Sequence, residues 1–136
     1  MRLATLSLLF LAACAQTPPP SSPDDWAALA DALSSEEYAE TFVEELESRL
    51  DDAGADLSDS QREAVYDALV AGSERQRALL DARATMSEAD LVTRLRAVDA
   101  RTDAEVEAVL TPQQVPVYLA LQTEARAALA REASRT

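Results

Sequence analysis

Apolar residues after position 24 recur every three or four residues, and this spacing restricts the fold more than any other feature of the chain. Alternating apolar and polar residues, which would predict strands, are missing. Helix-favouring alanine, leucine, glutamate and arginine dominate, and the chain has only 2 glycines. We therefore predict an all-α fold, a small bundle of four to five helices. The predicted helices span residues 23–33, 36–53, 59–84, 88–109 and 112–133.

Three of these segments have features that predict how they pack. Gly72 lies in the middle of the third, which favours a close contact with another helix or a bend, because glycine weakens a helix interior. Gln76 lies among the apolar residues of the same face. Pro116 lies inside the first turns of the fifth and is predicted to kink or loosen that end. The fourth segment presents a narrow seam for a partner helix, formed by Leu91, Leu95, Val98, Thr102, Val106 and Val109.

The N-terminus has the pattern of an export signal. Arg2 is followed by an apolar run of 11 residues, 3–13, whereas a spanning helix needs about 20. The run ends in LAAC, which resembles the lipobox of bacterial lipoproteins and implies cleavage before Cys14 and acylation of that cysteine. An ordinary secretory signal with an incidental cysteine is the alternative. The resemblance implies anchoring in a bacterial membrane, the outer in preference to the inner, facing the periplasm, or at the cell surface.

The predicted organisation has three parts. Residues 1–13 are the lipoprotein signal peptide, and residues 14–23 are the lipidated Cys14 and a linker in which three consecutive prolines favour an extended conformation. Residues 24–136 form the helical domain. Because the linker is short, we expect the domain to stay near the membrane surface.

The composition excludes most catalytic chemistry. The chain has no histidine and no lysine, and lipidation uses its only cysteine, so the usual general bases, Schiff-base amines and strong nucleophiles are missing. Met86 is the single thioether after residue 13, which disfavours a soft-metal site. A net charge of −13 disfavours contact with nucleic acid. We predict no enzymatic activity, no cofactor, no metal and no nucleic-acid partner.

Two five-residue segments, LSDSQ and LTPQQ, share one pattern of leucine, hydroxyl residue, two residues and glutamine. This is a capping box, in which the hydroxyl accepts from the amide three residues on and the glutamine reaches back to the cap amide. Each segment therefore predicts a helix start. On this basis Thr111→Ala should cost about 1 kcal/mol and Gln114→Ala less. The motif residues are Leu57, Ser58, Gln61, Leu110, Thr111 and Gln114.

The two boxes begin at 57 and 110, and such a pair in an exported helical chain resembles the LTxxQ repeats of the Spy/CpxP-like periplasmic proteins. The resemblance covers residues 57–130. It implies a helical hairpin that pairs into a homodimer, and a function as an ATP-independent chaperone or as an accessory in envelope stress signalling. Metal-sensing members of the family use histidine, which this chain lacks.

Two function classes follow. The first is a tethered module that binds unfolded or partner polypeptides. The second is a passive structural lipoprotein that oligomerises through its helices, and a seam closed within one chain or by its twin would favour it. The acidic segment 24–56 is predicted to lie over a group of arginines and compete with clients for them. These predicted client-binding residues are Arg75, Arg77, Arg83, Arg94, Arg96 and Arg101.

Overall fold

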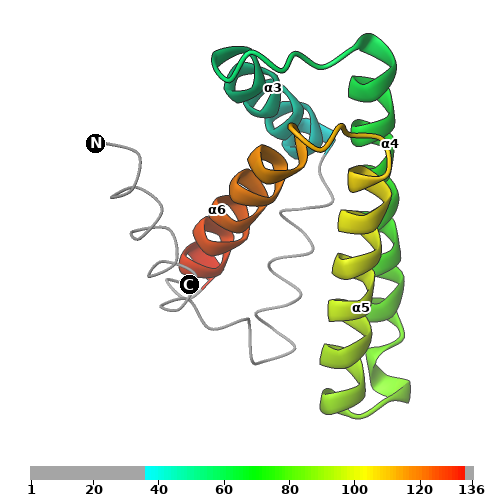
Figure 1. Cartoon of the computed structure of the whole chain (residues 1–136). Coiled ribbons are helices and arrows are strands. Elements are labelled where there is room, and N and C mark those ends of the chain that lie inside the picture. The colour runs from blue at the N-terminus through cyan, green and yellow to red at the C-terminus, as the bar shows by residue number, and fades with distance from the viewer. Residues whose placement is uncertain (1–35, 134–136) are drawn as a thin grey trace.

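The computed structural model describes residues 36–133, which contain four α-helices and one short 3-10 helix (Figure 1). In chain order they are α3 (Glu36–Asp52), α4 (Asp59–Asp81), η1 (Arg83–Thr85), α5 (Glu88–Glu107) and α6 (Val115–Ala133). No strand occurs among the described residues, so the predicted all-α class is confirmed. The predicted helix at 23–33, the linker and Cys14 lie outside them. None of these four helices combines the length and apolar character needed to cross a bilayer.

Local signals explain where the helices begin and end. Gly54 follows α3 with a φ of 69°, a left-handed conformation in which glycine has no steric cost. Ser58 caps α4, and the Ser87 hydroxyl caps α5 by accepting from the Asp90 amide at 3.2 Å. The predicted ends of the second, third and fourth segments therefore lie within a few residues of the observed ones.

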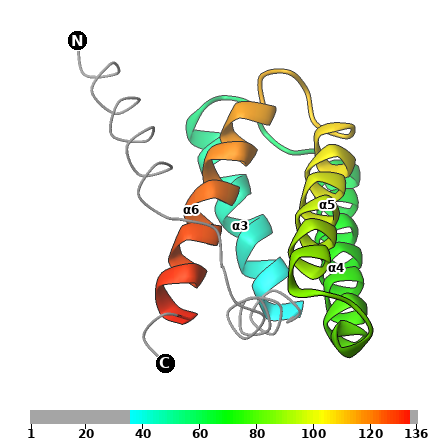
Figure 2. The same ribbon diagram turned by 90° about the horizontal axis from the view of Figure 1, so that it is seen from below.

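The helices are arranged as two pairs. α4 and α5 form an antiparallel hairpin closed by η1, and α6 lies beside α3 (Figures 1 and 2). α3 packs against both α4 and α6 and so joins the pairs. The two connections at 53–58 and 108–114 lie close together at one end of the bundle, away from η1.

The main core lies between these two pairs. All four helices contribute to it, and Leu46, Val65, Val106 and Tyr118 are fully buried there. Phe42 meets Tyr118 edge to face with ring centroids 5.9 Å apart, a favourable arrangement of two aromatic rings. A second, smaller cluster of Leu80, Leu91 and Leu95 lies near the η1 end of the hairpin.

The predicted seam of α5 is closed within the chain. Leu91, Leu95, Thr102 and Val106 are buried, because α5 packs along α4. Val109 lies beyond the end of α5 and is 37% exposed. The greater part of the seam is therefore not available to a second molecule.

Gly72 marks the close helix contact that its position predicts. It is buried in α4, and a methyl group at this position would overlap the hydroxyl and methyl of Thr102 in α5. Glycine fits here because the Thr102 side chain occupies the space that a Cβ at position 72 would need. The Thr102 hydroxyl donates to the Val98 carbonyl at 3.1 Å and so is satisfied within its own helix.

One helix boundary differs from the prediction. The fifth helix begins at Val115 instead of Pro112, so Pro116 occupies its first turn, where the missing amide hydrogen costs nothing and no kink is required. Within the described part of the acidic segment, 36–56, α3 pairs through Glu47 with Arg62 and through Arg49 with Glu124. The prediction that the segment 24–56 covers the six arginines also involves residues 24–35, which lie outside the described residues, so it stays a prediction.

Candidate functional site: two polar junctions

The first capping box has the predicted geometry. The Gln61 amide donates to the Ser58 hydroxyl at 3.1 Å, and the Ser58 amide donates to the Gln61 side-chain oxygen at 3.0 Å. Both halves of the reciprocal box are therefore present at the start of α4.

The second box makes the same reciprocal pair around a turn. The Thr111 amide donates to Gln114 Oε1 at 2.9 Å, and the Gln114 amide donates to Thr111 Oγ1 at 3.3 Å. Amide hydrogen bonds from Gln114 and Val115 to the Thr111 carbonyl close this turn directly before α6. The motif therefore shapes the entry into α6, although the helix itself starts at Val115.

The two glutamines meet each other, which capping alone does not predict. Gln61 Nε2 donates to Gln114 Oε1 at 2.9 Å and to the Val109 carbonyl at 2.9 Å. Gln114 Nε2 donates to the carbonyls of Ala55 and Asp56, each at 3.0 Å. Each side-chain amide thus binds the backbone immediately before the other motif. We call this contact the glutamine junction; it ties together the two connections at one end of the bundle.

The two glutamines of the junction differ in how deeply they are buried. Gln114 is only 2% exposed, whereas Gln61 is half-buried and the cap residues Ser58 and Thr111 are exposed. A buried amide without hydrogen bonds is costly in free energy, so the four hydrogen bonds of the Gln114 side chain stabilise the fold. The sequence signal for this role was the repeat itself, but the spacing of 53 residues does not reveal that the copies touch.

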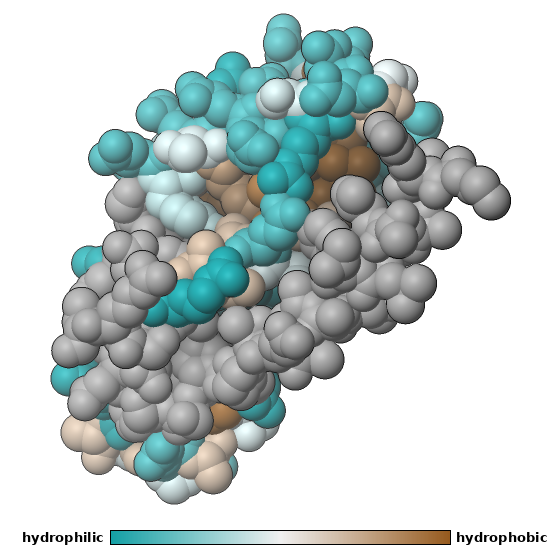
Figure 3. All heavy atoms as spheres, turned by 90° about the vertical axis from the view of Figure 1, so that its left-hand side faces the viewer, coloured by the Kyte–Doolittle hydropathy of each residue, from teal (hydrophilic) through white to brown (hydrophobic). Residues whose placement is uncertain are grey.

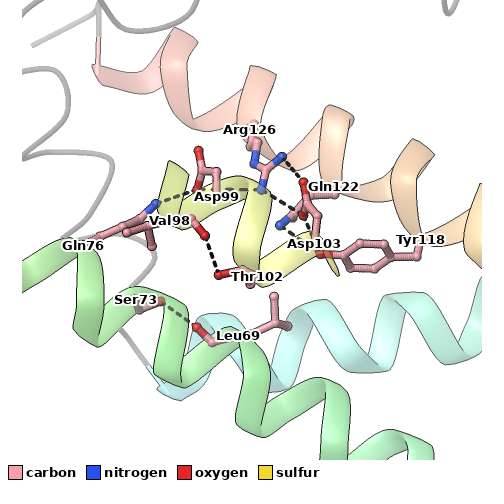
Figure 4. A network of polar contacts seen from close by, with 10 residues as sticks. All are labelled: Leu69, Ser73, Gln76, Val98, Asp99, Thr102, Asp103, Tyr118, Gln122 and Arg126. Atoms are coloured by element: carbon pink, nitrogen blue, oxygen red, sulfur yellow. Dashed lines mark hydrogen bonds and ion pairs between the residues drawn. The ribbon is translucent and has the colours of Figure 1, made fainter. Parts of the chain in front are cut away.

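A second polar junction, drawn in Figure 4, lies between α5 and α6. Arg126 binds Asp103 through both terminal nitrogens, each at 3.0 Å, and the Tyr118 hydroxyl donates to the same carboxylate at 2.8 Å. Asp99, one turn earlier, lies 3.7 Å from Arg126 and accepts from Gln76 Nε2 of α4 at 2.6 Å. We call this group the arginine junction.

Burial perturbs the titrating groups of the arginine junction. It raises the pKa of Asp99 above its ordinary value, an effect that Arg126 partly opposes and the Asp103 carboxylate reinforces. Burial also raises the pKa of Tyr118, and the charge of Asp103 adds to that shift. The pKa of Tyr38, raised by burial to about 12, likewise keeps this phenol neutral at physiological pH. Gln76 within an apolar face was the only sequence signal for this junction.

The six predicted client-binding arginines do not form one site. Arg75 and Arg101 both bind Glu105, at 3.2 and 2.9 Å, and their hydrogen bonds lower the pKa of that carboxyl. Arg83 donates to the Leu80 carbonyl at 2.8 Å near the end of α4. Arg94 and Arg96 are exposed on α5, and no ion pair to either is found among the described residues. Arg77 is exposed on α4.

Few large hydrophobic side chains of the described residues are exposed. On the part of the face in Figure 3 that is not grey, teal hydrophilic side chains border a brown hydrophobic area. Val109 and Leu119 are the only large hydrophobic residues of the described chain that are classed as exposed, at 37% and 39%. A shallow groove of about 410 Å³ between α3 and α4 is lined mainly by polar side chains, among them Glu40, Glu63 and Tyr66.

The polar groups of the two junctions form hydrogen bonds and ion pairs with one another. The glutamine junction contains amide and hydroxyl groups, and the arginine junction adds carboxylates and a guanidinium group. No cluster of three potential metal ligands occurs among the described residues. In comparisons with known proteins, no family model, curated sequence or solved structure matches the chain at a significant level.

Proposed function

We propose that the chain is a bacterial lipoprotein, held on the periplasmic face of the outer membrane or at the cell surface by acylated Cys14, whose helical domain binds unfolded or partner polypeptides without ATP. It acts as a homodimer, without cofactor, metal or catalytic activity. The observation that carries the proposal is the glutamine junction. Two copies of an LTxxQ-like motif, far apart in sequence, bond directly to each other, which supports treating them as a pair; the resemblance to Spy/CpxP-like proteins rests on this pair.

The exposed arginines suggest how polypeptides are held. Arg94 and Arg96 project charge from α5 while most apolar side chains are buried. Exposed charged contacts contribute only about 0–1 kcal/mol each and weaken with salt. Such a surface holds acidic segments of a client weakly and releases them without an energy source.

A second candidate is the passive structural lipoprotein, and one observation favours it. The α5 seam is closed by α4 of the same chain, so the described domain displays no long apolar stripe for clients. In that case the domain is a spacer whose polar surface contacts another envelope component.

An aggregation assay separates the two candidates. The whole chain with Cys14→Ala is purified and added without ATP to a chemically unfolded, acidic test protein that aggregates on dilution. We expect suppression at low salt, its loss in Arg94→Glu/Arg96→Glu, and its retention in the charge-preserving control Arg94→Lys/Arg96→Lys. No suppression by the parent chain would contradict the binding proposal and leave the structural one.

A further inference from the structure

A small cavity lies where the two helix pairs meet. Its volume of about 20 Å³ is sufficient for one water molecule, since roughly 10–15 Å³ measured in this way holds one. Most of its lining residues are polar and they come from all four helices, and the cavity is partly open to the surface. The lining includes Tyr38 of α3, Gln76 of α4, Asp99 and Thr102 of α5, and Gln122 and Arg126 of α6.

The orientation of the Gln122 amide follows from its neighbours. The Tyr118 hydroxyl gives its single proton to the Asp103 carboxylate, which is held by Arg126. Tyr118 can therefore only accept from Gln122, so Nε2 must face it, at 3.4 Å, and an exchanged amide would place two acceptors together. Gln122 Oε1 therefore faces away from the Tyr118 hydroxyl.

Gln122 Oε1 is a buried hydrogen-bond acceptor that lacks a donor among the described residues. The residue is 4% exposed, and no donor among the described residues reaches this oxygen. Buried polar atoms in folded proteins nearly always have a partner, and ordered water is the usual one when no protein group is in reach. Gln122 lines the cavity, so a donor of the size of a single water molecule in the cavity would supply the missing hydrogen bond to Oε1.

We propose that the cavity holds one ordered water molecule, which donates one hydrogen bond to the buried Gln122 Oε1 and another to the Asp99 carboxylate. This water adds a second connection between α6 and α5 beside the Arg126–Asp103 pair, and Asp99 in turn accepts from Gln76 of α4. A monovalent cation fits less well, because Arg126 already supplies positive charge in the same wall. The inference is independent of the proposed function.

High-resolution crystallography of the whole chain with Cys14→Ala tests this site. We expect a solvent peak within about 3.2 Å of Gln122 Oε1 and within the same reach of Asp99. Crystals soaked in rubidium chloride should show no anomalous peak there. Absence of solvent density, or an anomalous rubidium peak at this position, overturns the proposal.

A matched pair of variants tests the role of the amide. Gln122→Met keeps the length of the side chain but removes the acceptor, and we expect the solvent peak to be lost. Gln113→Met replaces an exposed glutamine in the turn before α6 and should retain it. A peak that persists in Gln122→Met shows that Gln122 does not hold the water and contradicts the proposal. Should Gln122→Met fail to fold, the parent crystals and the rubidium soak decide.

Discussion

Replacing Gln114 by methionine tests the glutamine junction most directly. The two side chains have similar length and volume, so the change removes hydrogen bonds without opening a large cavity. Gln114 Oε1 accepts from Gln61 Nε2 and the Thr111 amide, and Nε2 donates to the carbonyls of Ala55 and Asp56, all within 3.0 Å. These four hydrogen bonds contribute about 0.5–1.5 kcal/mol each.

We expect Gln114→Met to lower the free energy of unfolding by about 2–3 kcal/mol, less than the full sum because Asp56 and Thr111 are exposed and can turn to water. Thr111→Ala should cost only about 1 kcal/mol, since it removes one exposed cap acceptor at 3.3 Å. Capping alone predicts a larger stability loss at Thr111 than at Gln114, whereas the structure predicts the larger loss at Gln114. With a urea m-value of about 1.5 kcal/mol per M, the midpoint for Gln114→Met should fall by roughly 1–2 M.

The assay is urea unfolding of the whole Cys14→Ala chain, followed by the helical signal in far-ultraviolet circular dichroism. Gln113→Met is the control, because this neighbouring glutamine is exposed and should change stability by less than about 0.5 kcal/mol. The reasoning is refuted if Gln114→Met costs no more than Thr111→Ala while the m-value and the helical content stay unchanged.

Four further changes have definite expected outcomes. Asp103→Asn should cost about 2–3 kcal/mol in urea unfolding, because the carboxylate bonds Arg126 and Tyr118, and an unchanged midpoint would contradict that role. Asp99→Asn should instead stabilise the protein at pH 7. The folded pKa of Asp99 is raised, so its ionised form disfavours the native state, and the advantage of the variant should vanish as pH falls below about 4; a gain that grows on acidification would contradict this sign. Gly72→Ala should cost about 1–3 kcal/mol through overlap with Thr102, and a neutral result would show that the helices separate easily. Cys14→Ala should abolish labelling by a fatty-acid probe and release the protein from membranes, whereas persistent labelling would exclude lipidation at this residue.

Helix content and most boundaries followed from local information. The four-residue recurrence of apolar side chains, the caps at Ser58 and Ser87, and Gly54 after α3 all act within one or two turns, so they can be recognised without a tertiary structure. Gly72 belongs to the same group, because a glycine inside a helix indicates close packing even when its partner is unknown.

Local information was insufficient at the start of α6. LTPQQ has the pattern of a capping box, and its reciprocal bonds do form, yet they close a turn instead of starting the helix. Gln114 is held by the connection before α4, so the backbone at 111–114 follows that contact. Pro116 then falls in a first turn, where its ring is tolerated, and the predicted helical residues 112–114 form a turn instead.

The contacts that define both junctions were decided by the tertiary structure. Apolar periodicity shows which face of a helix is buried but not which helix covers it, because any complementary apolar face can do so. The bonds of Gln114 to Gln61, and of Arg126 to Asp103, join residues 53 and 23 positions apart. The sequence by itself determined that the chain is helical, where its caps lie and that one glycine permits a close approach. Only the packing of the two helix pairs brought these buried polar groups within bonding distance.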